Sequence, residues 1–219
     1  MGDRAAKDAL YEGLAEVAKA MASGRRAELV DVLAQGERSV DDLAAEIGQS
    51  VANTSHHLRA MARAGLVRTR RDGTRIHYRL AGPDVAALYA RLREVAAAHS
   101  PQVSAARDSY LGPADTEQVS SDELVRRARA GQVVVLDVRP VEEYAAGHIP
   151  GAVSIPLDQL TDRLAELPAG TGVVAYCRGA WCVLAHDAVR LLTAHGRPAA
   201  RLVDGMLEWR LADLPVAVS

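Results

Sequence analysis

The 219-residue sequence contains no Phe, few aromatic residues and only two Cys. Without Phe, Leu, Val and Ala must build the cores. Two cysteines five positions apart cannot form a secreted disulfide framework, and a reducing compartment would keep them available for redox or sulfur chemistry. No apolar run approaches the roughly 18–20 residues of a membrane helix, and the charged, amphipathic start does not read as a signal peptide. We therefore expect a cytoplasmic protein without a membrane partner.

Length and charge indicate two domains and a polyanionic partner. Domains cluster at roughly 100–150 residues, so 219 residues favour two of them. The net charge of −2 hides an uneven distribution. Residues 50–80 hold one acid, Asp72, and seven arginines, which are Arg59, Arg63, Arg68, Arg70, Arg71, Arg75 and Arg79. Such a cluster favours a polyanion such as nucleic acid.

The first 64 residues have helical periodicity. Apolar residues recur at spacings of three and four over residues 5–22, which predicts an amphipathic helix that either packs into the core or forms half of a dimer interface. A second helix is expected over residues 25–35. Ser39 offers a capped start for a short helix over 42–47, which Gly48 ends, and Ser50 caps a longer helix reaching Ala64. Two helices joined at Gly48 predict a helix-turn-helix.

The second of these helices has a polar side. Val51, Ser55, Leu58 and Ala62 are expected on one face, and the remaining faces carry Asn53, His56, Arg59, Ala60 and Arg63. Such a polar face suits base edges and phosphates, although a solvated helix would look similar.

Residues 65–80 alternate around Asp72-Gly73, which is a strong hairpin signal. Its arginines gather at the tip. A basic hairpin directly after a helix-turn-helix is typical of a wing that reaches the DNA backbone or minor groove.

These elements together resemble the winged helix-turn-helix of ArsR-type bacterial regulators. The resemblance rests on Ser55-His56-His57-Leu58-Arg59 and Ala64-Gly65-Leu66-Val67 and covers about residues 4–111. It implies a homodimer that reads a palindromic operator in double-stranded DNA. The candidate DNA-binding residues are Asn53, Ser55, His56, His57, Arg59, Arg63, Arg70, Arg71 and Arg75.

The metal sites of this family are not expected here. The helix before the recognition helix contains no Cys, and the helix predicted over residues 84–99 lacks the paired Asp/His and His/Glu set of the other common site. We expect neither a metal nor a cofactor.

The remainder of the chain alternates between strands and helices. Pro and Gly residues between 100 and 115 indicate a boundary, so we predict domains over residues 1–111 and 112–219. Helices are expected up to Ala130 and over 141–146, 157–167 and 183–194, and strands over 132–140, 153–155, 172–176 and 200–202. This order predicts an α/β domain with a parallel sheet, so the fold is multi-domain, mainly α and then α/β.

Cys177 lies where the strand over residues 172–176 meets the following helix. Ligands bind at the carboxyl ends of such strands. Backbone N–H groups and the helix dipole at such a turn favour negative charge, so we expect Cys177 to be pushed toward its thiolate. A buried, inert cysteine is the alternative.

Residues 119–218 resemble a rhodanese domain. The resemblance rests on Asp137-Val138-Arg139, Glu142-Glu143-Tyr144, Gly147-His148-Ile149-Pro150-Gly151-Ala152, the Cys177 loop and Asp204-Gly205-Met206-Leu207-Glu208-Trp209. It implies that Cys177 accepts sulfane sulfur as a persulfide, held by N–H groups of residues 178–182. The loop has the shorter, sulfur-carrying length. Asp137 and Arg139 are expected to form a structural ion pair, and His148 to brace its turn.

Cys182 stands where many single-domain rhodaneses carry Arg. A cationic contact to an anionic donor such as thiosulfate is therefore in doubt. Cys182 offers a resolving thiol, or it packs the first turn of the helix. Arg178 and Trp181 line the sulfur pocket or shape the loop. The candidate catalytic residues are Cys177, Cys182, Arg178 and Trp181.

Both halves together suggest a one-component regulator. A sulfane-sulfur donor or an oxidant would modify Cys177 and thereby alter the grip of the dimer on DNA. The alternative is a sulfurtransferase in which the winged helix only localises or dimerises the protein. The operator, the donor and acceptor, and whether Cys177 and Cys182 pair are left open by the sequence.

Overall fold

The computed structural model describes residues 3–219, and these separate into two compact units that meet between Tyr89 and Ala90. Within the described residues, no helix combines the length and apolar character needed to span a bilayer. The boundary predicted between residues 111 and 112 stays a prediction. Each unit is described by itself below.

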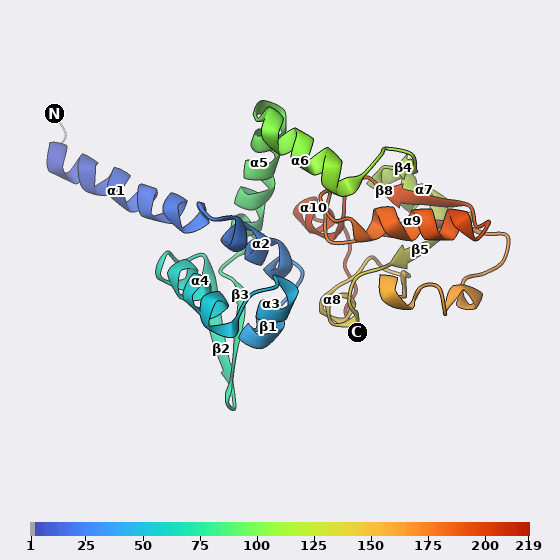
Figure 1. Ribbon diagram of the computed structural model, residues 1–219, viewed down its shortest axis with the longest axis horizontal. Helices are drawn as coiled ribbons and strands as arrows, with labels where there is room; N and C mark the ends of the chain where they lie inside the picture. The colour runs from blue at the N-terminus through green and yellow to red at the C-terminus, as the bar shows by residue number, and fades with distance from the viewer. Residues whose placement is uncertain (1–2) are drawn as a thin grey trace. The chain divides into compact units, whose positions relative to one another are not determined.

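The first unit is a small helical domain with a three-stranded antiparallel sheet of order β1-β3-β2 (Figure 1). The elements are α1 (Arg4–Met21), α2 (Gly24–Leu33), β1 (Arg38–Ser39), α3 (Val40–Glu46), α4 (Val51–Arg63), β2 (Val67–Asp72), β3 (Arg75–Leu80) and the first turns of α5 (Pro83–His99). The helices surround a buried core that includes Leu29, Leu43, Leu58 and Met61. This arrangement confirms the predicted winged helix-turn-helix.

Local capping explains how the helix-turn-helix is built. The Ser39 hydroxyl accepts from the Asp42 N–H and the Asp42 carboxylate accepts from the Ser39 N–H, which forms a capping box at the start of α3. After α3, Gly48 adopts a φ of 60°, a left-handed conformation that costs other residues free energy. Ser50 then caps α4 by accepting from the Asn53 N–H. The chain thus turns sharply between the two helices.

The buried face of α4 includes a polar residue. Thr54, Leu58 and Met61 point inward, whereas Val51 is 44% exposed and Ser55 is half-buried. The spacing of four and three places residues 54, 58 and 61 on one side of a helix. Of the four residues predicted to share one face, Leu58 is buried, Ser55 and Ala62 are half-buried and Val51 is exposed, so that face is only partly covered.

The second unit is built on a five-stranded parallel sheet of order β4-β8-β7-β5-β6. After the last turns of α5, its elements are α6 (Pro101–Leu111), β4 (Glu117–Val119), α7 (Ser121–Arg129), β5 (Val133–Asp137), α8 (Val141–Ala146), β6 (Val153–Ser154), β7 (Gly172–Tyr176), α9 (Leu184–Ala194), β8 (Ala199–Leu202) and α10 (Met206–Leu211). The predicted α/β fold with a parallel sheet is confirmed.

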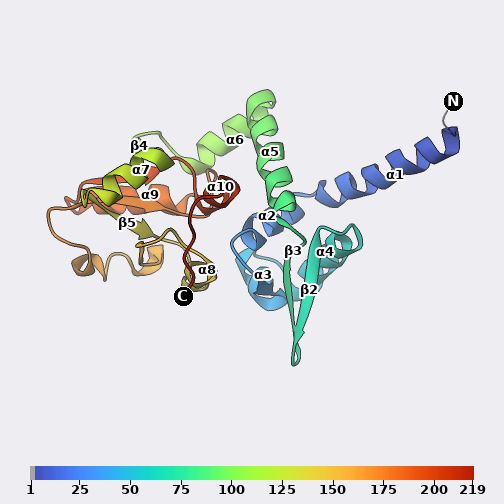
Figure 2. The ribbon, with the colours of Figure 1, turned by 180° about the vertical axis from the view of Figure 1, so that it is seen from behind.

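Helices cover both faces of this sheet (Figures 1 and 2). On one face, α9 buries Ala188 and Leu192 against Leu136 and Ala175. On the other face, α7 and α10 join a cluster that contains Tyr176. Strands buried on both sides read as continuous apolar runs, which is why β5 and β7 were predictable.

The helix predicted over residues 157–167 is wrong. The segment holds two short 3₁₀ turns, η1 (Leu157–Gln159) and η2 (Leu164–Glu166), joined by turns. Leu160 and Leu167 are both buried, and the Arg197 side chain donates to the Leu167 carbonyl. Burial of these two leucines under the sheet outweighs a helical spacing that the chain would otherwise follow. The short elements β1, β4 and α10 were not predicted.

Candidate functional site

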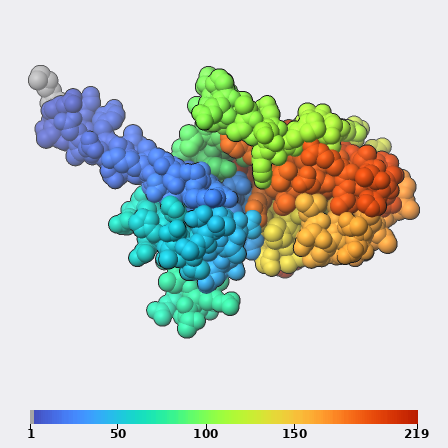
Figure 3. All heavy atoms as spheres, in the orientation of Figure 1, coloured from blue at the N-terminus to red at the C-terminus, as the bar shows by residue number. Residues whose placement is uncertain are grey.

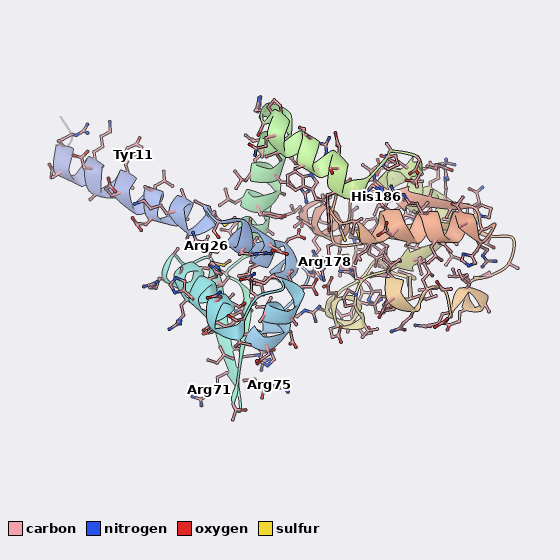
Figure 4. The ribbon with its side chains drawn as sticks, in the orientation of Figure 1. Tyr11, Arg26, Arg71, Arg75, Arg178 and His186 are labelled. Carbon is pink, nitrogen blue, oxygen red and sulfur yellow. The ribbon has the colours of Figure 1, made fainter. Side chains whose placement is uncertain are left out.

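The hairpin of β2 and β3 is a two-stranded ribbon with arginines at its tip. Asp72 pairs with Arg75 across the turn, and Gly73 adopts a φ of 58°. Every β2 residue after Val67 is exposed. Figure 3 shows the tip standing out from the rest of the first unit, and Figure 4 shows Arg71 and Arg75 at that tip, one from each strand. The sequence-predicted wing therefore presents these two side chains to solvent.

Arg70 differs from its neighbours because it binds carboxylates of its own unit. Its guanidinium lies 2.6 Å from Glu37 and 3.3 Å from Asp72. The hydrogen bonds to Glu37 and then Asp72 raise the pKa of Arg70. Arg71 makes a local contact, since its Nε donates to the Gly73 carbonyl at 3.1 Å. A phosphate would therefore have to compete with these carboxylates at Arg70.

The polar residues of α4 are presented on its outer side. Asn53, His56, Arg59 and Arg63 are exposed, and His57 is half-buried. Burial, and then the charge of Arg26, lowers the pKa of His57, which disfavours the charged form of this ring. The candidate residues of α4 and the hairpin lie in one unit, where α4 packs against β2.

Cys177 directly follows β7 and is buried, with 3% of its surface exposed. Its thiol donates to the Cys182 carbonyl, with 3.3 Å between sulfur and oxygen. Two of the loop N–H groups are used elsewhere: the Cys182 N–H donates to the Gly179 carbonyl and the Ala180 N–H donates to Glu208. The N–H groups of Gly179 and Ala185 face the Cys177 sulfur.

The electrostatics of the loop shift the pKa values of the two thiols in opposite directions. Burial, and then hydrogen bonding and charge from Cys182, raises the pKa of the Cys177 thiol despite the N–H groups of Gly179 and Ala185. Interaction with the Cys177 side chain lowers the pKa of Cys182, and the nearby Arg178 charge acts in the same direction. The expectation that the turn pushes Cys177 toward its thiolate is wrong for the resting protein, because burial outweighs the backbone dipoles.

Arg178 is held within the loop by an ion pair. Its guanidinium lies 2.6 Å from Glu143 of α8, and the Glu143 side chain is fully buried. The N–H groups of Met206 and Leu207 donate to the carbonyls of Cys177 and Arg178. Arg178 therefore anchors the loop to α8, and backbone hydrogen bonds from α10 hold the loop backbone.

A buried polar network supports the strand end beside the loop. Arg139 and Asp137 form an ion pair at 2.6 Å with both side chains fully buried, which confirms the predicted structural pair. The Tyr176 hydroxyl donates to Asp137 and accepts from the Ile149 N–H. His148 stacks on Tyr144 with ring centroids 3.7 Å apart and its Nδ1 contacts the Tyr144 carbonyl, so it braces its turn as expected.

Arg93 was not singled out from the sequence, and Glu208 was quoted only as part of a motif. Arg93 lies on α5, forms an ion pair with Glu208 of α10 and lies over the Trp181 ring, with 5.6 Å to the ring centroid. The spacing of Ala86, Ala90 and Arg93 could have indicated this site, because these three residues lie on the same side of α5, and that side is buried. A charge on a helix face that otherwise buries Ala indicates a partner.

Across residues 3–219, no group of three His, Cys, Asp or Glu side chains gathers in a way that could hold a metal ion.

Two family models match this chain. Residues 23–69 match "Bacterial regulatory protein, arsR family", and residues 120–212 match "Rhodanese-like domain". The HTH-type transcriptional regulator Rv0324 of Mycobacterium tuberculosis is 51% identical over 210 residues, which span 96% of this chain and 92% of that protein. The chain belongs to the ArsR family of bacterial regulatory proteins. It is an ArsR-type transcriptional regulator that carries a C-terminal rhodanese-like domain.

Other relatives match one half of this ArsR-type regulator. A sulfurtransferase of Allochromatium vinosum is 30% identical over 45% of this chain and 92% of its own length. The solution structure of the homodimeric winged helix-turn-helix DNA-binding domain of Mb0332 from Mycobacterium bovis, fragment 1–100, is 45% identical. It covers 47% of this chain and 93% of that chain with a TM-score of 0.43.

Proposed function

We propose that this ArsR-type regulator binds a palindromic operator in double-stranded DNA as a homodimer, and that its rhodanese-like domain senses reactive sulfur or oxidant through a persulfide or disulfide at Cys177. The observation that carries the proposal is that Cys177 and Cys182 meet in one loop, where the Cys177 thiol donates to the Cys182 carbonyl at 3.3 Å. Two neighbouring thiols in the loop after a central strand provide a reactive group and its resolving partner.

DNA binding is supported by the first unit. The recognition helix α4 exposes Asn53, His56, Arg59 and Arg63, which have the donors that base edges and phosphates accept. The hairpin tip adds Arg71 and Arg75. We propose that α4 enters the major groove and that the two hairpin arginines contact phosphates or the minor groove.

Dimerisation is supported by apolar residues that face solvent. On α1, Leu10, Tyr11 and Leu14 are all more than half exposed. On α5, Leu88, Leu92 and Val95 form an exposed stripe with helical spacing. Side chains of this size are stabilised by burial, so each stripe is suited to a second copy of this chain.

The sulfur chemistry uses both thiols. When Cys182 is deprotonated, the Cys177 thiol can give its proton to Cys182, and the Cys177 sulfur then attacks the sulfane sulfur of an organic hydropersulfide, RSSH. A new S–S bond forms on Cys177, the S–S bond of the donor breaks, and RS⁻ leaves with the electron pair. Cys177 becomes a persulfide, and Cys182 is left as a thiol.

A disulfide can follow from this persulfide. Cys182, after losing its proton to solvent, attacks the Cys177 sulfur and releases HS⁻, which leaves Cys177 and Cys182 joined. With a peroxide as oxidant, Cys177 becomes a sulfenic acid as hydroxide leaves, and attack by the Cys182 thiol gives the same disulfide with loss of water. Because Cys177 is only 3% exposed, either product must displace loop atoms around it.

The test combines intact-protein mass with DNA affinity. Wild type, Cys177→Ser and Cys182→Ser are incubated with a polysulfide, and the intact mass of each protein is measured. Each sample is then titrated with an operator that the reduced wild-type protein has selected from random duplexes. We expect a sulfur adduct that requires Cys177 and changes the affinity. Equal affinity for reduced, loaded and Cys177→Ser protein would remove the sensing role.

A second candidate function is sulfur transfer. The similarity to the sulfurtransferase of Allochromatium vinosum spans 92% of that protein, and the Cys177 loop is present. In this case the adduct would pass to an acceptor such as cyanide or a thiol over many turnovers, while operator affinity stayed constant. The same samples separate the two functions.

A further inference from the structure

The Cys177 loop is tied to α10 through one carboxylate. Glu208 accepts from the Gly205 N–H at 2.9 Å, which caps α10, and from the Ala180 N–H of the loop at 3.4 Å. Ala180 lies three residues after Cys177 and two before Cys182. A single side chain thus fixes the start of a helix and the middle of the reactive loop.

Arg93 supplies the charge that this carboxylate needs. It pairs with Glu208, and the exposed fractions of the two side chains are 5% and 19%. The Arg93 guanidinium also lies over the ring of Trp181, the neighbour of Cys182. Two charges held so far from water stabilise each other, and removal of one leaves the other desolvated without compensation.

The pair lies directly against the loop backbone. A Cβ atom built on Gly179 would lie 3.2 Å from Arg93 Nη1 and 3.2 Å from Glu208 Oε2. Gly179 is two residues from Cys177. Arg93 itself lies outside both family-matched stretches, residues 23–69 and 120–212, so the helix before the rhodanese-like region contributes to its reactive loop.

We propose that Arg93 is a positioning residue for sulfur chemistry at Cys177, acting through Glu208 and Trp181 to hold the loop and to neutralise a carboxylate beside it. This inference rests on the proposed function. Arg93 reaches the loop from α5, and its charge is balanced by Glu208. Loss of Arg93 leaves the Glu208 charge beside a loop that must form a thiolate.

Other titratable groups interact electrostatically with the two thiols, and their effects must be constant in the comparison. They are Tyr110 of α6, Arg178 of the loop and Arg201 of β8. Glu143, His186, Asp187 and Asp204 interact in turn with these groups. Apart from one control, the variants below change only Arg93 and its partner.

The experiment measures the rate of sulfur loading from cysteine hydropersulfide by intact mass between pH 6 and 10. We expect Arg93→Gln to load roughly tenfold more slowly at neutral pH, with its pH profile displaced upward by about one unit. Arg93→Lys keeps the charge without the planar group and should recover part of the rate. The double variant Arg93→Gln/Glu208→Gln removes both charges and should return the pH profile toward wild type. Arg91→Gln, an exposed arginine two positions earlier on α5, is the matched control.

Several results would overturn the inference. An Arg93→Gln protein that loads with the wild-type rate and pH profile refutes it, as does a double variant whose profile stays with that of Arg93→Gln. If Arg93→Gln does not fold, Arg93→Lys and the double variant carry the comparison. If wild type takes no sulfur at Cys177, the proposed function fails by itself, and iodoacetamide alkylation of the loop thiols tests Arg93 by the same criteria.

Discussion

Removal of the two arginines at the hairpin tip should weaken DNA binding in a salt-dependent way. The change is Arg71→Gln/Arg75→Gln, and both side chains are exposed at the tip of β2 and β3. In a homodimer each wing loses two cations, so up to four phosphate contacts disappear. At about 0.9 in the logarithmic salt slope for each phosphate, the slope of the double variant should be smaller by about 3.6.

This slope translates into a measurable difference in affinity. Between about 50 and 200 mM salt, a slope difference of about 3.6 means that wild type loses about 150-fold more affinity than the variant. The assay is a fluorescence anisotropy titration of a labelled operator at five salt concentrations. An equal titration with an unrelated duplex should show the same change in slope, because phosphate contacts carry no sequence information.

A matched control removes the same charge elsewhere. Arg126→Gln/Arg129→Gln takes two exposed arginines from α7 of the second unit. We expect the slope of this control to stay with wild type. If the hairpin variant and the α7 control had the same slope as wild type, the hairpin would not contact DNA phosphates and its assignment as a wing would be refuted.

Three further predictions concern the second unit. Cys177→Ala should raise the pKa of Cys182, and Cys182→Ala should lower the pKa of Cys177, because each thiol contributes to the pKa shift of the other. The measurement is the pH dependence of alkylation. Profiles of both single-thiol variants that match wild type would contradict this prediction. Asp137→Asn should lower the free energy of unfolding, measured with urea, by about 3–5 kcal/mol, because Arg139 would stay buried without a carboxylate. A loss below about 1 kcal/mol would contradict a stabilising role of this ion pair. Burial first, and then nearby arginines, lowers the pKa of His186 to about 4. The unfolded chain therefore binds a proton that the folded chain does not, and the free energy of unfolding falls as the pH drops from about 6.5 toward 4. His186→Leu should reduce this fall, and an unchanged pH dependence of the free energy of unfolding would contradict the prediction.

Features fixed by local chemistry were predictable from the sequence. The continuous apolar runs that became β5 and β7 can only be buried on both faces, and the Asp72-Gly73 turn sets the hairpin. Ser39 and Ser50 marked helix starts because their hydroxyls satisfy backbone N–H groups. Each of these signals lies within a few residues of the element it defines.

Features that depend on distant contacts were not predictable. The spacing of residues 157–167 is helical, yet burial of Leu160 and Leu167 under the sheet produces separate turns. The charge balance of the two thiols depends on how deeply the loop covers Cys177, which spacing does not reveal. Arg93 and Glu208 are 115 positions apart, so their pairing became visible only in the folded chain.

The measurement that tests the account most directly is operator affinity through one cycle of modification. A single preparation of wild-type protein is titrated with operator when reduced, after loading with polysulfide, and again after treatment with dithiothreitol. The account predicts a change of roughly tenfold or more on loading, about 1.4 kcal/mol in binding free energy, that reverses on reduction and is absent in Cys177→Ser. Equal affinity at all three stages, with mass confirming the adduct, would contradict the account.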